Sequence, residues 1–390
     1  MRAVVADILC TTPYYSGALV RSQASLGLDV ELASPMFYLE PHFLDDVPRA
    51  PWILDLVLRA ARPRALRLAA RSVEASLNIK DLLGRVAADT YDVVHLQWIP
   101  FEEHTSLFMR LLRSRCDATG TLLVHTAHNA VPHDRLGTDV ARIRQNLDLA
   151  HLIVAQTDHV AAELAGLVGT KTPTVVIPHG PLFAERELPD RAAAAQRLGI
   201  THPGPIVLFL GLLRPYKGLD LLADAWPDVK AAVPDARLIV AGRRADRSVA
   251  GDLARLTRQS GVSLVDHYLS VATMLDYYAA SDLVVLPYRR ISQSGAFMTA
   301  TGLGRPTVMT PLAGLLEQAR GLDSAVFADE ISASAFARSV IASLHRVEEL
   351  GRAAAKDRAW IAESPSGWPN VARRTIDAYE HGLRSLRSTM

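Results

Sequence analysis

Residues 206–220 read Ile-Val-Leu-Phe-Leu-Gly-Leu-Leu-Arg-Pro-Tyr-Lys-Gly-Leu-Asp. The apolar run that opens this stretch is typical of a strand buried on both faces of a parallel sheet. It ends at Gly211, and Arg214 and Lys217 then precede a helical pattern. Two cations are therefore expected between the carboxyl end of a strand and the amino end of a helix, where open α/β sheets bind anions. Because arginine binds phosphate through paired hydrogen bonds and lysine adds a point charge, the stretch predicts a diphosphate site.

The composition limits the class of protein. The 390 residues are 49% hydrophobic and 21% charged, which allows two globular domains of ordinary size. A formal net charge of +1 does not indicate a nucleic-acid partner. Cys10 and Cys116 are too few for a disulfide framework, and the amino terminus reads as a strand rather than a signal peptide. The small number of cysteines leads us to expect a cytoplasmic protein. No apolar run reaches the roughly 18 residues that span a bilayer, so we expect it to be soluble or attached to a membrane surface.

Strand and helix patterns alternate along almost the whole chain, which predicts parallel sheets covered by helices. In the first half, strands are expected at Arg2–Leu9, Asp29–Ala33, Asp92–Gln97, Leu122–Thr126, Leu152–Ala155 and Thr174–Ile177. In the second half they are expected at Ile206–Leu210, Arg237–Ala241, Ser263–Val265, Leu283–Leu286, Pro306–Met309 and Ala325–Phe327. Proline and glycine break the rhythm around residues 178–205, which is the best candidate for a linker.

Several motifs of common ligand sites are absent. The sequence has no G-x-G-x-x-G fingerprint, no Walker A motif, no H-E-x-x-H, no paired C-x-x-C and no Asp-x-Asp. These absences favour a phosphate site built from cations and backbone amides, with no metal and no cofactor.

Three segments of the second half keep a characteristic order and spacing: Gly211–Ala225 with its Arg-Pro-Tyr-Lys-Gly loop, Ala236–Arg243, and Tyr278–Tyr288 followed by Ser292–Ala296, Gly304–Val308 and Ala313–Glu317. Together they are similar to glycosyltransferase family 4, a group of retaining enzymes with the GT-B fold. The first half resembles this family more loosely, through Asp92–Gln97 and Thr126–His133. The resemblance implies an α/β protein of two Rossmann-like domains that face each other across a cleft.

The resemblance also implies a division of roles. Residues 1–185 would form an acceptor-binding domain and residues 200–362 a nucleotide-sugar-binding domain, with the helix 366–390 packed back on the first. The implied reaction moves a hexose-type sugar, with retention, from a nucleoside-diphosphate sugar to a hydroxyl of a glycan, glycolipid or small molecule.

One departure from the family pattern keeps two alternatives open. Many members carry two glutamates eight residues apart, where this chain has Ile291 and Thr299. The Ser-Gln-Ser-Gly loop at residues 292–295 resembles a subgroup without that pair, although a catalytically silent partner subunit also fits. A nucleotide-sugar epimerase on the same fold is the other alternative.

The candidate donor residues gather in the loops of the second half. Arg214 and Lys217 are the predicted catalytic cations, which would hold the diphosphate and stabilise its charge as it leaves. The alternative, two exposed cations at a helix start, is disfavoured because the helix dipole opposes them. Ser294 is a good N-cap and Gly295 lets a ligand approach the backbone, although serine caps many ordinary helices. By resemblance, the other donor contacts would be Gly211, Gln293, Ala296, Thr299, Glu317, His267 and Tyr268.

The first half supplies candidates for the acceptor side or the cleft. His128 follows a predicted strand and would orient the acceptor or polarise the reacting sugar, and Asn129 and His133 share its loop. Tyr14 and Gly17 lie in the first strand-to-helix turn. A lone histidine is more often structural, and His95, inside a strand, is expected to be a hydrogen-bonded core residue.

A group of arginines follows Trp52 among leucines: Arg59, Arg62, Arg64, Arg67 and Arg71. The segment fits an interfacial helix at the inner face of the membrane, and it also fits a solvated basic face. Pro63 would interrupt a continuous helix there.

Overall fold

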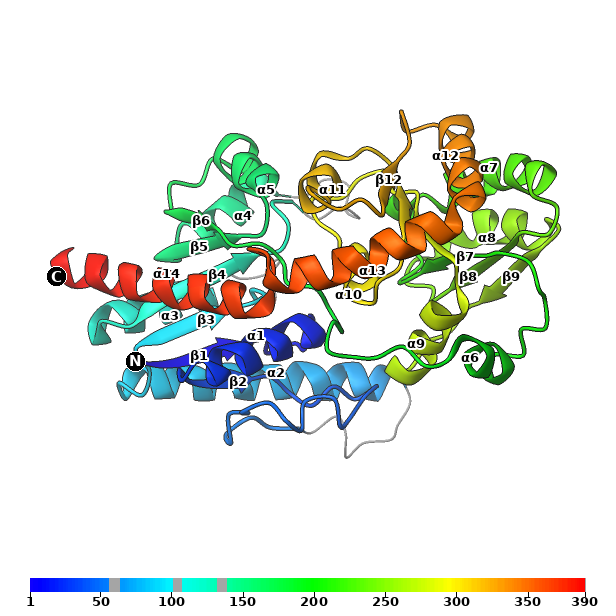
Figure 1. The fold of residues 1–390 in the computed structure, drawn as a ribbon. Coiled ribbons are helices and arrows are strands. Elements are labelled where there is room, and N and C mark those ends of the chain that lie inside the picture. The colour runs from blue at the N-terminus through cyan, green and yellow to red at the C-terminus, as the bar shows by residue number, and fades with distance from the viewer. Residues whose placement is uncertain (56–63, 101–106, 132–138, 390) are drawn as a thin grey trace. The chain divides into compact units, whose positions relative to one another are not determined.

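The computed structural model describes all residues except 56–63, 101–106, 132–138 and 390. The chain folds as two compact units. The first contains Met1–Val131, Gly137–Gly180 and Pro365–Met390, and the second is built from Pro181–Ser364. Each unit has one sheet of parallel strands covered by helices (Figure 1).

The sheet of the first unit has the strand order β2-β1-β3-β4-β5-β6, and every described pairing is parallel. Its strands are β1 (Arg2–Ala6), β2 (Asp29–Ala33), β3 (Val93–Leu96), β4 (Leu122–Ala127), β5 (Leu152–Ala155) and β6 (Thr174–Val176). Its helices are α1 (Pro13–Ser25), α2 (Arg64–Ala87), α3 (Leu107–Thr119), α4 (Val140–Leu147), α5 (Asp158–Glu163), the π-helix η1 (Leu164–Val168) and α14 (Trp368–Thr389).

Alternation along β1 divides the core of this unit into two layers. Val4 and Ala6 belong to a cluster with buried side chains of α2 and α3, whereas Ala3 and Val5 belong to a cluster with α1 and α14. Because successive side chains of a strand point to opposite faces, these helix pairs cover opposite faces of the sheet. The sheet is therefore buried on both sides, as its continuous apolar strands predict.

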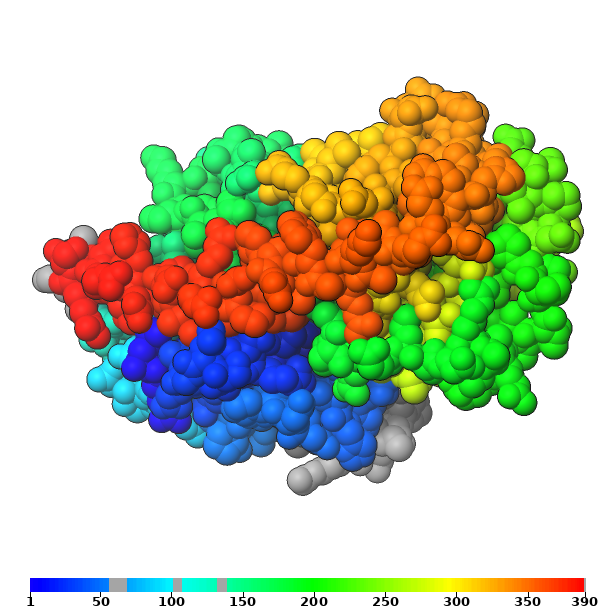
Figure 2. Space-filling model, viewed as in Figure 1, coloured from blue at the N-terminus to red at the C-terminus, as the bar shows by residue number. Residues whose placement is uncertain are grey.

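Helix α14 belongs to the first unit although it closes the chain. It lies beside α1, as Figure 1 shows for the red and blue helices, and both contribute to the surface in Figure 2. Tyr379 of α14 is fully buried, and its hydroxyl contacts Gln23 of α1 at 3.2 Å and His95 of β3 at 2.6 Å. These contacts join the end of the chain to the first sheet.

The sheet of the second unit has the order β12-β11-β10-β7-β8-β9 and is also parallel. Its strands are β7 (Ile206–Leu210), β8 (Arg237–Ala241), β9 (Val262–Val265), β10 (Leu283–Leu286), β11 (Thr307–Met309) and β12 (Ala325–Phe327). Its helices are α6 (Arg191–Arg197), η2 (Pro215–Lys217), α7 (Leu219–Ala232), η3 (Arg247–Val249), α8 (Ala250–Thr257), α9 (Val271–Ala280), α10 (Gly295–Gly302), α11 (Ala313–Gln318), α12 (Ala333–His345) and α13 (Val347–Glu363).

Every strand predicted from the sequence is present. The largest difference is at β1, which ends at Ala6 rather than Leu9. The chain turns there because the buried Asp7 carboxylate accepts hydrogen bonds from the backbone N–H groups of Thr11 and Thr12, at 2.8 and 2.9 Å.

The arginine segment after Trp52 is only partly described. Arg59, Arg62 and the side chains of Arg64 and Arg67 lie outside the described residues. Helix α2 is described from Arg64 onward, so the interruption predicted at Pro63 also lies outside the described residues. Arg71 donates a hydrogen bond to the carbonyl of Leu9 and is partly buried. Among the residues that the structure describes, no helix combines the length and apolarity needed to cross a membrane.

Candidate functional site

The strand order of the second sheet places two loops together. Strands β7 and β10 are neighbours, but the chain leaves β7 toward β8 and leaves β10 toward β11 on the other side. Such a reversal of direction opens a crevice at the carboxyl ends of the strands, where α/β proteins bind ligands. The loop after β7 carries Arg214 and Lys217, and the loop after β10 carries Ser294.

Backbone contacts fix these two loops against each other. The N–H of Arg289 donates to the carbonyl of Tyr216 at 2.8 Å. Gly218 has φ of 70°, and a Cβ at this position would overlap the carbonyl oxygen of Pro287. The loop after β7 is also held by β8, because the N–H of Leu213 donates to the carbonyl of Arg243 at 3.0 Å. The predicted cations therefore lie on a rigid turn.

Gly218→Ala is expected to destabilise the second unit by about 2 kcal/mol or more, since alanine is strained at positive φ and its methyl group would also meet Pro287. Urea unfolding measures the effect. Gly251→Ala is the matched control, because nothing lies within 4 Å of that position in α8, and it should be neutral or stabilising by about 0.5–1 kcal/mol. A Gly218→Ala midpoint equal to that of the wild type would contradict the expectation.

Lys217 is the more confined of the two cations. Its Nζ lies 5.3 Å from the ring centroid of Tyr288, and a Cβ at Gly211 would come within 2.8 Å of that Nζ. Desolvation lowers the pKa of Lys217, and the positive charge of Arg214 lowers it further. Arg214 is partly exposed and is close enough to lower the pKa of Asp246, which follows β8. A confined cation with a lowered pKa is typical of a site that awaits an anion.

The start of α10 offers hydrogen-bond donors to the same crevice. Ser294 is the N-cap, as predicted, and its Oγ accepts from the N–H of Phe297 at 3.1 Å. The N–H of Ser294 donates to Gln318 Oε1 at 2.7 Å and is therefore occupied. The amides of Gly295 and Ala296 have no acceptor among the described residues, so these two donors remain for a ligand.

The remaining donor candidates differ in how they are placed. Thr299 is buried and donates its hydroxyl hydrogen to the carbonyl of Gly295 at 2.8 Å, so its oxygen can only accept from a ligand. Gln293 has a buried Oε1 without a hydrogen-bond partner among the described residues. Glu317 is partly exposed in α11. Helix α11 packs directly on the loop after β10, since Gly314 lies so near the carbonyl of Ser292 that a Cβ at this position would overlap it.

His267 and Tyr268 lie farther along the sheet. They follow β9, which is separated from β7 by β8. Asp266 ties their loop to the loop after β8 through a 2.6 Å ion pair with Arg244. The donor contacts of His267 and Tyr268 stay predictions.

In the first unit, His128 directly follows β4 and is 4% exposed. Its Nδ1 lies 3.1 Å from Gln156 Oε1, and its Nε2 lies 3.2 Å from Gln97 Oε1. Burial lowers the pKa of His128 to about 3, so the ring is neutral at pH 7. A neutral ring carries one N–H, so one of the two glutamines presents its amide NH₂ to the ring. Both ring nitrogens are occupied, and a direct catalytic role would require one of these bonds to open.

Aromatic rings hold His128 in this position. Trp98 stacks on it with centroids 5.3 Å apart and an interplanar angle of 10°, and Tyr15 meets its edge at 5.2 Å. His95 is buried and bonded to Thr126 and Tyr379, each at 2.6 Å, as expected for a core histidine. The structure thus surrounds His128 with groups that fix its orientation.

The other candidates of the first unit have local explanations or lie outside the description. Tyr14 and Gly17 were expected in the first strand-to-helix turn, but both lie inside α1, which already begins at Pro13. Tyr14 packs edge-on against Phe43 at 4.7 Å. A Cβ at Gly17 would lie 2.9 Å from Leu44, so close packing accounts for this glycine without a ligand. Asn129 is partly exposed after β4, and His133 lies outside the described residues.

Sequence reasoning missed residues at both sets of strand ends. Gln97 and Gln156 follow β3 and β5, the two neighbours of β4. Each is a polar residue directly after a buried strand, and this position could have marked them as candidates. Gln318 had no signal, because its contact with Ser294 joins residues 24 positions apart. Tyr288 was visible only as part of an apolar run.

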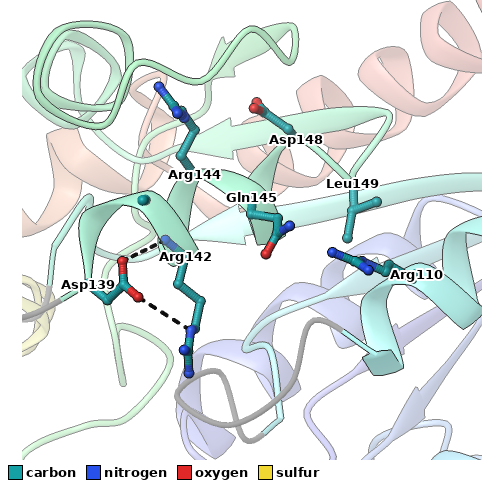
Figure 3. Close-up of a pocket in the computed structure, with 8 residues that line it drawn as sticks. Arg110, Asp139, Arg142, Arg144, Gln145, Asp148 and Leu149 are labelled. Atoms are coloured by element: carbon teal, nitrogen blue, oxygen red, sulfur yellow. Dashed lines mark hydrogen bonds and ion pairs between the residues drawn. The ribbon is translucent and has the colours of Figure 1, made fainter.

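A shallow cavity of about 730 Å³ lies elsewhere in the first unit, between α3 and α4 (Figure 3). Arg110, Arg142 and Arg144 are among its lining residues, and Arg142 pairs with Asp139 at 3.5 Å. Figure 3 shows the three guanidinium groups pointing in different directions, so they do not form one anion site. None of the predicted site residues lines this cavity. In the described ranges, no group of three or more His, Cys, Asp or Glu side chains could hold a metal ion.

The family model described as "Glycosyl transferases group 1" matches residues 204–346. The match includes both loops of the β7–β10 crevice, together with α10 and α11. Residues 204–346 are thus similar to group 1 glycosyltransferases. The finer assignment to a subgroup with Arg-Pro-Tyr-Lys-Gly and Ser-Gln-Ser-Gly loops remains a prediction.

The chain also has relatives that are named as glycosyltransferases. D-inositol 3-phosphate glycosyltransferase 2 of Catenulispora acidiphila is 27% identical over 63% of this chain and 59% of the relative. GDP-mannose:glycolipid 4-beta-D-mannosyltransferase of Xanthomonas campestris is 29% identical over 56% of this chain and 61% of the relative. The alignments thus span about three fifths of these relatives' own lengths.

Comparison with solved structures extends the fold assignment beyond residues 204–346. Anabaena HepE, solved in complex with UDP and glucose, superposes with a TM-score of 0.69 at 15% identity. The superposition covers 97% of this chain and 99% of HepE. The predicted GT-B fold of two Rossmann-like domains is confirmed.

Proposed function

We propose that this chain is a retaining glycosyltransferase, which moves a hexose-type sugar from a nucleoside-diphosphate sugar to a hydroxyl of a glycan, glycolipid or small molecule. One observation carries the proposal. At the β7–β10 crevice, Arg214 and Lys217 lie on one loop, and the free amides of Gly295 and Ala296 belong to the loop fixed against it. Cations and helix amides together suit the two phosphates of such a donor.

The proposed mechanism follows the charges that develop during transfer. As the bond to the donor sugar breaks, negative charge grows on the diphosphate, where these cations and amides would stabilise it. Asp7, the buried carboxylate at the end of β1, is already bonded to Thr11, Thr12 and Ser16 and does not suit a covalent nucleophile. We therefore favour front-face substitution, in which the departing phosphate accepts the proton of the acceptor hydroxyl.

Turnover with a panel of donors tests the proposal. UDP-glucose and GDP-mannose come first, because HepE was solved with UDP and glucose and the Xanthomonas relative is named for GDP-mannose. Sugar transfer to an added acceptor is expected, and epimerised donor without acceptor would favour the epimerase. No reaction, with nucleotide still bound, would favour a silent partner subunit.

The anomeric configuration of the product deserves separate measurement. We propose retention, whereas the name of the Xanthomonas relative specifies a beta-linked product. Proton NMR of the product distinguishes the two anomers, and inversion would exclude front-face substitution with retention.

Two further parts of the proposal concern metal and location. We propose a metal-independent reaction, so the rate of sugar transfer should be unchanged in EDTA.

We also propose a cytoplasmic protein whose Arg59–Arg71 segment contacts the inner face of the membrane. Cell fractionation and co-sedimentation with anionic vesicles measure these properties.

A further inference from the structure

Tyr288 occupies the point where three strand-end loops of the second unit meet. It lies two residues beyond β10 and is 1% exposed. Its backbone carbonyl accepts a hydrogen bond from the Thr310 hydroxyl, after β11, at 2.6 Å. The preceding residue, Pro287, packs on Gly218, and the next, Arg289, donates to Tyr216. The backbone of Tyr288 is therefore fixed by loops from β7 and β11.

The side chain of Tyr288 contacts both halves of the candidate donor site. Its ring lies under the Lys217 ammonium group, with Nζ 5.3 Å from the centroid. Its hydroxyl lies beside the side chain of Ser294, the N-cap of α10: burial raises the pKa of Tyr288, and Ser294 partly offsets that rise. One buried side chain thus joins the cation on the first loop to the helix start on the second.

Each contact has a physical consequence. Desolvation and Arg214 disfavour the charged form of Lys217, and the negative face of an aromatic ring favours it. Ser294 Oγ accepts from the N–H of Phe297, so the neighbouring Tyr288 hydroxyl restricts the side chain that caps the first turn of α10. Losing the ring would affect Lys217, whereas losing only the hydroxyl would affect Ser294.

We propose that Tyr288 is a positioning residue for a nucleoside diphosphate: its ring keeps Lys217 charged and in place, and its hydroxyl holds Ser294, so that the cation and the α10 amides face the same diphosphate. The proposal rests on the function proposed above. It assigns to Tyr288 no contact with the ligand itself.

The first test needs no ligand. Reductive ¹³C-methylation labels the few lysines of the chain, which are Lys80, Lys171, Lys217, Lys230 and Lys356, and Lys217→Arg identifies the Lys217 signal. NMR titration should show a lower pKa for Lys217 in Tyr288→Leu than in the wild type. Tyr288→Phe keeps the ring and should retain the wild-type value. An unchanged pKa in the leucine variant would overturn the role of the ring.

The second test measures binding of UDP, GDP and TDP by calorimetry, using the full chain. For the nucleotide that the wild type binds best, Tyr288→Leu should bind about 5- to 30-fold more weakly. The corresponding monophosphate should lose less, because it lacks one of the phosphates that the cation and amides contact. Tyr277→Leu, at a tyrosine of α9 without a described contact to Lys217, is the matched control and should bind normally. Equal binding by wild type and Tyr288→Leu would refute the proposal.

The outcomes separate the two hypotheses. If the wild type binds none of the three nucleotides, the proposed function is rejected. If the pKa of Lys217 is nevertheless lower in Tyr288→Leu, the coupling between Tyr288 and Lys217 is retained. If Tyr288→Leu does not fold, the double-mutant cycle of Tyr288→Phe and Ser294→Ala replaces it. Effects on nucleotide affinity should then be non-additive, and additive effects would refute the link through the hydroxyl.

Discussion

Lys217→Ala and Arg214→Ala are each expected to lower kcat for sugar transfer by about 10²–10³-fold, the usual cost of removing one group that stabilises a developing anion. Lys217 is confined beside Tyr288 and Gly211, so no other described side chain can easily replace its charge. Steady-state kinetics with the donor used by the wild type measures the loss. Because the negative charge on the diphosphate grows as the bond breaks, kcat should fall more than the affinity for donor.

Matched controls are available in the same unit. Arg255 of α8 forms an exposed ion pair with Asp224 of α7, and Lys356 is exposed on α13. Arg255→Ala and Lys356→Ala should retain the wild-type kcat, since surface ion pairs contribute little and neither residue lies at the β7–β10 crevice. Wild-type kcat in both Arg214→Ala and Lys217→Ala would remove the assignment of this crevice as the donor site.

The first unit is expected to lose stability steeply below about pH 6.5. Burial lowers the pKa of four of its histidines: to about 3 in His95 and His128, and to about 4 in His125 and His179. Below pH 6.5 the unfolded chain therefore binds protons that the folded chain does not, and each histidine costs about 1.4 kcal/mol per pH unit. All four together cost about 5–6 kcal/mol per unit, which is comparable with the stability of a domain.

Urea unfolding between about pH 7.5 and pH 5 measures this slope, with limited proteolysis to show which unit opens first. Asp7 acts in the opposite direction, because burial raises its pKa and protonation of the folded form favours folding at low pH, but it is one group against four. His125→Gln should reduce the slope by about one quarter, and the exposed His42→Gln is its matched control. A first unit whose unfolding midpoint does not change with pH would show that these histidines are not buried neutral in solution.

Local patterns predicted the elements well because strands buried on both faces need continuous apolar runs. Ile206–Leu210 and Arg237–Ala241 have the same bounds in the structure as in the prediction. Ser294 was also predictable, since an N-cap acts on an amide three residues away. The turn after Ala6 was missed. The Asp7 carboxylate makes this turn by accepting hydrogen bonds from residues close to it in the chain, and the sequence does not distinguish such a carboxylate from one that simply ends a strand.

The roles of single residues were harder to predict. His128 was expected to act on substrate, yet both its nitrogens bond to glutamines that follow β3 and β5. Backbone amides near Ser294 were expected to face phosphate, yet the amide of Ser294 itself donates to Gln318. In both cases the hydrogen-bond partner comes from another strand end or helix. A periodic pattern in the sequence does not indicate which distant side chain will be that partner.

The sequence by itself determined that the chain alternates strand and helix, that two basic residues follow a buried strand, and that glycines flank them, because these depend on interactions within a few residues. The tertiary structure decided which loops meet. Only the order β10-β7-β8 brings the Lys217 turn against Tyr288 and the start of α10, since strand pairing joins segments about 80 residues apart and depends on packing across the whole sheet.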